Sequence, residues 1–134
     1  MNTTLAVIGA IFVGLAALLH VYIFVMESIQ WSKPAIWRRF GLKSQADADT
    51  TKPMAFNQGF YNLFLAIGVG TGLVLLAVGA TPVGLGMIFL GAGSMVAAAL
   101  VLVLSSPKLA RAAAIQGILP LLGIIFLVLA LVTA

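Results

Sequence analysis

Four long apolar stretches divide the chain, and they predict four membrane-spanning helices. A transmembrane helix needs about 20 predominantly apolar residues, because a rise of about 1.5 Å per residue must cross a hydrocarbon core of about 30 Å. Each stretch reaches that length, and polar side chains interrupt it at few positions. The predicted helices cover approximately residues 5–27, 57–80, 83–104 and 110–132.

The connection between the first two predicted helices, residues 28–56, is the one long segment with a polar character. Within it, Ser32 as a cap and Pro34 in the first turn predict a short helix over about 33–41, which Gly41 would end. Its aromatic and cationic residues are typical of a helix that lies at the membrane surface.

The second half of that connection is expected to differ from the first. Residues 43–53 are polar and rich in Ala and Thr. Such a composition buries little apolar surface, so we expect a mobile loop there.

The composition agrees with a membrane protein. Of the 134 residues, 63% are hydrophobic and 7% are charged, whereas soluble domains carry about 25% charged residues. The sequence therefore predicts an all-α polytopic membrane protein, with one four-helix transmembrane domain over residues 1–134. The chain has no Cys and a single His, so we expect no disulfide, no thiol chemistry, no metal site and no cofactor.

The positive charges predict the orientation of the chain in the membrane. All of them lie in the first connection or beside the turn between the third and fourth predicted helices: Lys33, Arg38, Arg39, Lys43, Lys52, Lys108 and Arg111. Because Lys and Arg near helix ends stay on the cytoplasmic side, both termini are expected outside. Topology and attraction to membrane lipid then account for the net charge of +4, and no nucleic-acid partner is predicted.

The second and third predicted helices are rich in glycine. The glycines in question are Gly68, Gly70, Gly72, Gly84, Gly86, Gly91 and Gly93. Small residues let helix backbones approach closely inside a membrane. The pattern predicts tight packing within the chain or, alternatively, a homo-oligomer formed through these two helices.

The few polar side chains inside the predicted helices gather at one depth. They are His20 and Glu27 on the first helix, Asn57, Gln58, Tyr61 and Asn62 on the second, and Gln116 on the fourth. A rise of about 1.5 Å per residue places all of them within about 10 Å of the predicted cytoplasmic boundary. Polar groups inside a span are costly and mark functional sites by default, although bonds that hold helices together are an alternative. We therefore expect a cytoplasm-facing polar pocket between the first, second and fourth helices.

Helix geometry limits how these side chains pair. His20 and Glu27 share a helix face, but about 10 Å along the axis separates them, which is too far for a direct hydrogen bond. The remaining polar side chains supply the expected partners: Tyr61, Asn62 or Gln116 for His20, and Asn57, Gln58 or Arg111 for Glu27.

The same residues carry a resemblance to a known family. The segments in question are His20 to Glu27, Trp31, Phe40-Gly41-Leu42, Asn57-Gln58-Gly59-Phe60-Tyr61-Asn62, and Gln116 to Pro120. This pattern resembles the small bacterial four-helix integral membrane proteins known as domain of unknown function 1304. The resemblance covers essentially the whole chain and implies the four-helix fold and a bacterial inner (plasma) membrane. It implies no reaction.

Three functions remain open at this point. The leading hypothesis is a pocket between the first, second and fourth helices that binds a small amphipathic or lipid-like molecule. The polar head of that molecule would meet His20 and the polar residues of the second and fourth helices, and Glu27 would lie at the mouth of the pocket. If the protein is also an enzyme, such as an isomerase, His20 or Glu27 would be the catalytic acid or base. One alternative is a small oligomeric proton-coupled transporter component, for which a site near the midplane is expected. The other is a structural membrane subunit, in which the polar layer only joins helices.

Overall fold

Each of the four apolar stretches forms a long helix in the computed structural model, which describes residues 1–133. Helix α1 (Thr3–Phe24) continues into the π-helical turn η1 (Val25–Ile29), and α3 (Gln45–Ala77), α4 (Thr81–Ser105) and α5 (Ala110–Val132) follow. All four are long and apolar enough to cross a membrane. The predicted all-α fold with four transmembrane helices is confirmed.

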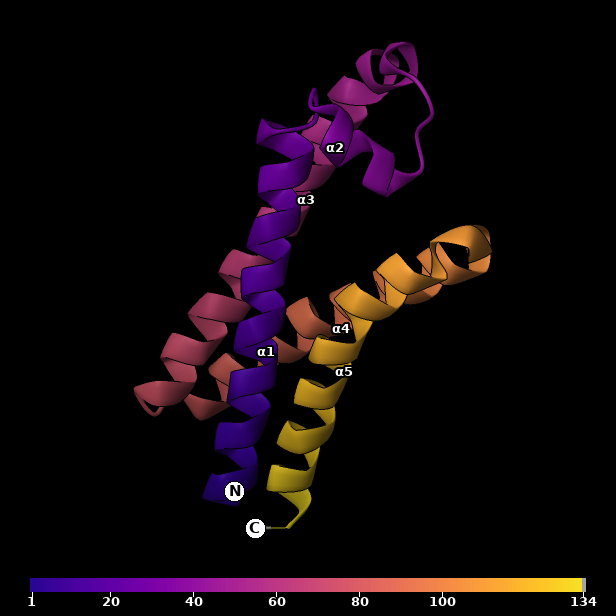
Figure 1. Ribbon diagram of the computed structural model, residues 1–134. Coiled ribbons are helices and arrows are strands. Elements are labelled where there is room, and N and C mark those ends of the chain that lie inside the picture. Colours follow the sequence, from indigo (N-terminus) through magenta and orange to yellow (C-terminus); the bar gives the residue numbers. More distant parts are fainter. Residues whose placement is uncertain (134) are drawn as a thin grey trace.

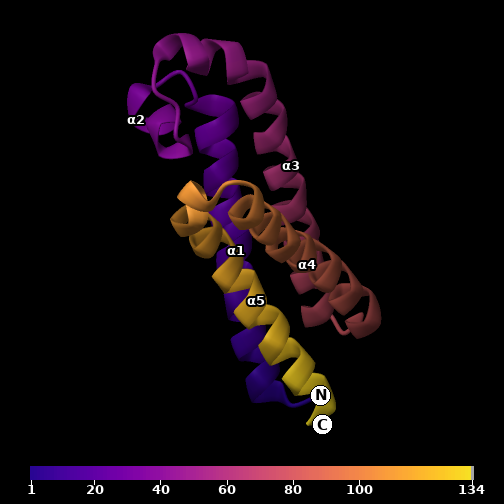
Figure 2. The same ribbon diagram turned by 90° about the vertical axis from the view of Figure 1, so that its right-hand side faces the viewer.

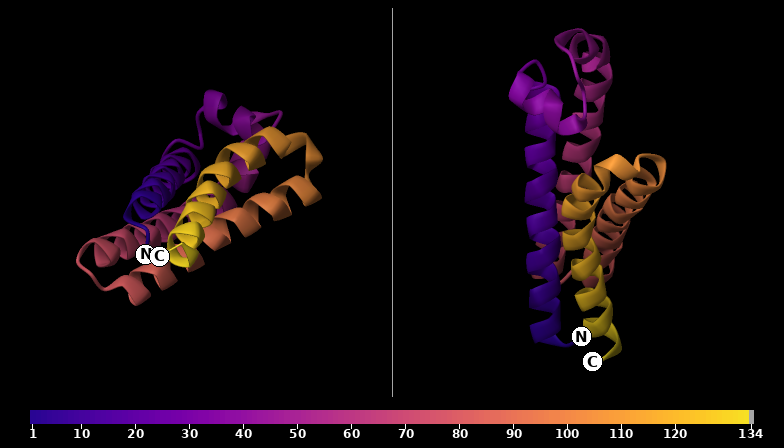
Figure 3. Two further views of the ribbon diagram at one scale, coloured as in Figure 1. Left: turned by 90° about the horizontal axis from the view of Figure 1, so that it is seen from below. Right: turned by 45° about the vertical axis from the view of Figure 1, so that its right-hand side comes forward.

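The four long helices form a ring in which α1 lies between α3 and α5, and α4 closes the ring on the far side. The chain ends and the α3–α4 turn lie at one end of the bundle (Figures 1 and 2). The first connection lies at the other end, and the α4–α5 turn points toward that end but away to the side (Figure 3). Every Lys and Arg belongs to that first connection, to the start of α3, to the α4–α5 turn or to the first turn of α5.

The surface and the interior of the bundle are both apolar, as a membrane protein requires. Val13, Val69, Ile88, Met95 and Leu127 are fully buried at the centre. Large apolar side chains of all four long helices are also exposed on the outside. Lipid tails solvate such a surface directly, whereas water does not.

Glycines make the closest helix contacts. A Cβ atom on Gly72 of α3 would lie 2.8 Å from the carbonyl oxygen of Gly84 on α4. Gly9 and Gly123 bring α1 and α5 together in the same way, since a Cβ atom on Gly9 would lie 3.1 Å from the Gly123 carbonyl oxygen. These contacts lie within the chain. Of the glycines that predicted this packing, Gly68, Gly70, Gly86 and Gly93 have no neighbour within 4 Å of an added Cβ. The predicted homo-oligomer stays a prediction.

The start of α3 differs from the sequence prediction. The helix begins at Gln45 rather than near residue 57, so most of the segment 43–53, which we expected to be a loop, is helical. The Ser44 hydroxyl oxygen caps it by accepting a hydrogen bond from the Asp47 N–H at 3.1 Å. With 33 residues, α3 is about 50 Å long and exceeds a hydrocarbon core of about 30 Å. Its polar first turns therefore extend beyond the membrane.

The short helix of the first connection forms as predicted. Helix α2 (Pro34–Trp37) runs into the 3₁₀ turn η2 (Arg38–Phe40), and Gly41 ends it with a φ of 84°. Lys33 rather than Ser32 occupies the cap position. The second 3₁₀ turn, η3 (Pro107–Leu109), leads into α5.

The tryptophans of this connection are buried inside the protein rather than exposed on its surface. Trp31 is 6% and Trp37 is 3% exposed. The Trp31 indole N–H donates to the Ala48 carbonyl oxygen at 2.9 Å, and the Trp37 indole N–H donates to the Gln45 side-chain oxygen at 3.2 Å. The early start of α3 supplies both partners. We call the group that packs here the Trp cluster: Trp31, Trp37, Phe40, Leu42, Ala48 and Ala55.

Candidate functional site

A widened helical turn holds Glu27 inside the protein. In η1 the Gln30 N–H donates to the carbonyl oxygen of Val25, five residues earlier, at 2.9 Å. Glu27 is only 8% exposed, and its Oε2 accepts a hydrogen bond from Asn62 Nδ2 of α3 at 2.9 Å. Single π turns of this kind are rare and frequently lie at functional sites. The end of the first span, where η1 lies, is therefore the first candidate for a functional site.

Close backbone contact between η1 and α3 makes this hydrogen bond possible. A Cβ atom on Gly59 would lie 3.1 Å from both the Glu27 Cβ and the Ser28 backbone nitrogen, and it would overlap the Ser28 hydroxyl. That hydroxyl donates to the Phe56 carbonyl oxygen at 2.8 Å. Asn62 lies one helical turn beyond Gly59 on α3, which brings its amide within reach of the Glu27 carboxylate.

A cavity of about 250 Å³ opens beside Glu27. Its walls come from η1, from the first connection and from the early part of α3. The lining residues are Glu27, Trp31, Phe40, Leu42, Thr51, Met54, Ala55 and Gln58. Ligand pockets have volumes of about 300–1,000 Å³, so this cavity lies just below that range and fits only a very small molecule or one end of a longer one. It combines a carboxylate and an amide with an otherwise mainly apolar wall.

His20 does not join this group. It is 2% exposed, and its Nδ1–H donates a hydrogen bond to the Ala16 carbonyl oxygen of its own helix at 2.8 Å. Within residues 1–133, none of the three partners that we expected for it, Tyr61, Asn62 and Gln116, is hydrogen-bonded to it.

The helix register explains this difference. Since α1 and α3 run antiparallel with Glu27 opposite Asn62, seven residues back along α1 correspond to seven residues forward along α3. That step leads to Val69, in an apolar part of α3. His20 therefore lies level with apolar α3 side chains rather than with the polar ones.

The other sequence-predicted residues separate into two groups. Of the partners expected for Glu27, Gln58 lines the cavity beside it, whereas its observed hydrogen bond comes from Asn62. Asn57 and Tyr61 are exposed on α3, Tyr61 by 59%, and Gln116 is half-buried on α5. The structure thus places Gln58 in the cavity wall beside Glu27 and bonds Asn62 to Glu27. The remaining predicted residues neither line the cavity nor bond to Glu27: His20, Asn57, Tyr61 and Gln116.

Several cavity residues were missed by the sequence analysis. Thr51, Met54 and Ala55 line the cavity from the segment of α3 that lies before residue 57. A signal for this early helix start was present, because Ser44 followed three residues later by the acidic Asp47 is typical of a helix N-terminus. Trp31, Phe40 and Leu42 belong to the segments that carry the family resemblance, but their place beside Glu27 depends on how the connection folds back, which no sequence signal predicts.

Comparison with known proteins gives the family of the chain. The family model described as Protein of unknown function (DUF1304) matches residues 14–128. No curated protein and no solved structure matches the chain. The matched region includes η1, the first connection, α3, α4 and most of α5, and it therefore contains the whole candidate site. This four-helix membrane protein belongs to the DUF1304 family of proteins of unknown function.

Proposed function

We propose that this membrane protein binds a small amphipathic or lipid-like molecule in the cavity beside Glu27. The observation that carries the proposal is a largely buried carboxylate in the wall of a mainly apolar cavity. A carboxylate has about four acceptor sites, and Asn62 supplies a donor to one of its oxygens. Burial of a carboxylate is costly unless its remaining acceptor sites are used, and a polar group of a ligand would use them.

The arrangement of the walls supports an amphipathic ligand. Glu27 and Gln58 would hydrogen-bond the polar end of the molecule. Trp31 and Phe40, whose ring centroids lie 5.0 Å apart, and Met54 would contact its apolar part. The cavity lies where the first span meets the connection, which is the depth at which amphipathic molecules accumulate in a bilayer.

We also propose that the cavity faces the cytoplasm of a bacterium and that both termini lie outside its plasma membrane. The distribution of Lys and Arg supports this orientation, because all of them belong to segments that lie away from the two chain ends (Figure 1). The ligand would then enter from the cytoplasmic side or from the adjoining leaflet.

Proton transfer by Glu27 is a second candidate activity. Glu27 is the one acidic or basic side chain among the residues that line the cavity. A carboxylate in that position could take a proton from one carbon of a bound molecule and return it to another, which is an isomerisation. This proposal assigns the acid–base role to Glu27 and not to His20, whose ring is bonded to its own helix.

Two threonines on α3 offer a matched test of binding. Thr51 lines the cavity and donates to the Asp47 carbonyl oxygen at 2.8 Å, whereas Thr50 is exposed and donates to the Ala46 carbonyl oxygen at 2.9 Å. Thr51→Leu fills the cavity, and Thr50→Leu removes the same kind of local hydrogen bond without touching it. Native mass spectrometry of gently extracted protein then shows which variant retains a small molecule.

The expected result is a bound species in the wild type and in Thr50→Leu, with at least tenfold lower occupancy in Thr51→Leu. Equal occupancy in both variants would contradict the proposal. So would a wild-type protein that carries no small molecule and that no fraction of a lipid extract stabilises against heat. In that case the Glu27–Asn62 hydrogen bond serves only to join helices.

A further inference from the structure

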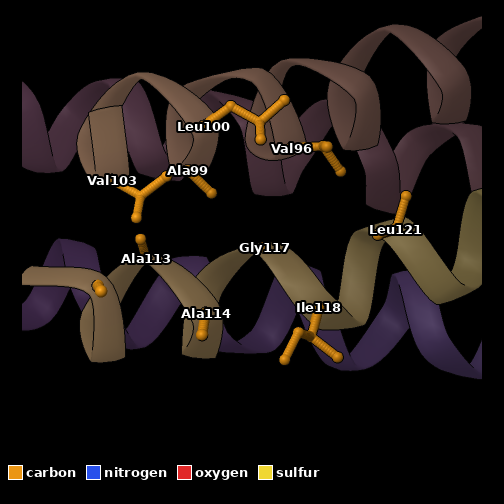
Figure 4. Close-up of a pocket in the computed structure, with 10 residues that line it drawn as sticks. Val96, Ala99, Leu100, Val103, Ala113, Ala114, Gly117, Ile118 and Leu121 are labelled. Carbon is orange, nitrogen blue, oxygen red and sulfur yellow. The ribbon is translucent and has the colours of Figure 1, made fainter. Parts of the chain in front are cut away.

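A second recess lies between α4 and α5 and shares no residue with the cavity beside Glu27. It has a volume of about 230 Å³. Figure 4 shows its walls, in which Ala99 and Val103 of α4 stand across from Ala113 and Gly117 of α5. Every residue that lines it is apolar or is a glycine: Val96, Ala99, Leu100, Val103, Ala110, Ala113, Ala114, Gly117, Ile118 and Leu121. We call this recess the α4–α5 groove.

Small residues create the α4–α5 groove. The two helices touch where a Cβ atom on Gly117 would lie 2.7 Å from the Ala99 Cβ. Three alanines of α5 also line the groove, whereas the larger Leu100 and Ile118 are more than half exposed. The result is a shallow apolar channel on the lipid-facing side of the hairpin.

The length of the groove matches one leaflet of a bilayer. It runs along α5 from Ala110 to Leu121, which is about 16 Å at a rise of about 1.5 Å per residue. This is about half of a hydrocarbon core of about 30 Å. An acyl chain of a lipid in one leaflet spans about that length, whereas a transmembrane helix of a second copy would continue across the whole core.

Positive charge lies at the mouth of the groove. Lys108 in η3 and Arg111 in the first turn of α5 are both exposed and flank the lining residue Ala110. They are the only charged residues after Lys52 in the sequence, so no carboxylate of α4, η3 or α5 neutralises them. Lys and Arg bind phosphate oxygens through charge-assisted hydrogen bonds, and the surface of an anionic leaflet attracts them.

We propose that the α4–α5 groove holds one acyl chain of an anionic phospholipid, and that Lys108 and Arg111 bind its phosphate group. The groove selects the chain by its apolar walls and its single-leaflet length. The two cations select an anionic headgroup over a zwitterionic one. The proposal concerns a site separate from the cavity beside Glu27, so either can fail without the other.

Two alanines of α5 give a matched pair for the test. Ala114 lines the groove and Ala112 does not, and both are exposed. Ala114→Phe therefore fills the groove, while Ala112→Phe adds the same side chain to a neighbouring position. The double variant Lys108→Gln/Arg111→Gln removes the charge and leaves the groove open. Far-UV circular dichroism and size exclusion verify that each variant is folded.

The probes are phosphatidylglycerol and phosphatidylcholine with identical acyl chains, titrated onto delipidated protein and counted by native mass spectrometry. We expect wild type and Ala112→Phe to bind one phosphatidylglycerol about tenfold more tightly than phosphatidylcholine. Ala114→Phe should lose this binding by about tenfold, and the double charge variant should bind both lipids alike. The double variant alters only exposed side chains, so it provides a test even if Ala114→Phe does not fold.

Three outcomes would overturn the proposal. The first is equal binding of both lipids by the wild type. The second is undiminished phosphatidylglycerol binding by folded Ala114→Phe. The third is a dimer that Ala114→Phe dissociates, which would make a second copy of the chain the occupant of the groove.

Discussion

Replacement of Gly59 by alanine tests the close contact on which the candidate site depends. An added Cβ atom would lie 3.1 Å from the Ser28 backbone nitrogen and from the Glu27 Cβ, and it would overlap the Ser28 hydroxyl. The hydroxyl can rotate away only by giving up its hydrogen bond to the Phe56 carbonyl oxygen. The backbone contact is relieved only if η1 and α3 move apart, which also lengthens the Glu27–Asn62 hydrogen bond.

The expected change in the free energy of unfolding of Gly59→Ala has three contributions. Alanine in place of glycine inside a helix stabilises the folded state by about 0.5–1 kcal/mol. Loss of the Ser28 hydrogen bond costs about 1 kcal/mol, and overpacking of a tight contact costs about 1–3 kcal/mol. Gly59→Ala should therefore lower the free energy of unfolding by about 1–3.5 kcal/mol.

Gly68 provides the matched control on the same helix. A Cβ atom there meets nothing within 4 Å, so Gly68→Ala should leave stability unchanged or raise it by about 0.5–1 kcal/mol. Unfolding in mixed micelles with rising dodecyl sulfate, followed by the fluorescence of Trp31 and Trp37, measures both variants. Equal midpoints for the two variants would contradict this prediction, because they would mean that η1 and α3 do not touch at Gly59.

A double variant separates the cost of the overlap with the Ser28 hydroxyl from the cost of the backbone contact. In Ser28→Ala/Gly59→Ala the overlap with the hydroxyl is absent, and the Ser28–Phe56 hydrogen bond is lost only once. The combined loss of stability should therefore be smaller than the sum of the two single losses, as is usual for residues in contact. Strict additivity would show that the cost of Gly59→Ala arises elsewhere.

Two further predictions concern the same region and the topology. Asn62→Leu removes the donor to the buried Glu27 carboxylate and should lower the free energy of unfolding by about 1.5–3 kcal/mol, whereas Asn57→Leu at an exposed position should change it by less than about 0.5 kcal/mol; similar values for both would contradict the Glu27–Asn62 contact. Because the chain has no Cys, single cysteines report the side of the membrane, and a membrane-impermeant maleimide should label Thr133→Cys in intact cells but Asp49→Cys only after lysis. The reverse labelling would place the termini inside.

The four spans could be predicted from the sequence because their length and apolar content leave no other solution in a bilayer. The start of α3 could not be predicted from the same signal, since hydropathy does not mark a helix that extends into water. Ser44 caps that helix, and the Trp cluster packs against its first turns. Both are contacts of individual side chains, which a hydropathy window averages away.

The candidate site could be predicted only in part, for a related reason. Glu27, Gln58 and Asn62 stand out because they are polar residues near the ends of apolar spans. Their depth alone does not fix which of them meet, because that depends on the register between α1 and α3. The register is set by Gly59, whose hydrogen side chain allows the contact with Ser28, and by the π turn η1. His20 was paired wrongly for this reason.

The cavity exists because α3 does not begin at the membrane boundary. Three of the residues that line it, Thr51, Met54 and Ala55, belong to the turns of α3 that precede the apolar stretch. The Trp31 indole is bonded to Ala48 on those same turns, and this bond helps to hold the connection over Glu27. If this segment were a mobile loop, the carboxylate would face water, and water would solvate it more cheaply than any ligand. The polar start of α3 is therefore part of the proposed binding site and not a spacer between two spans.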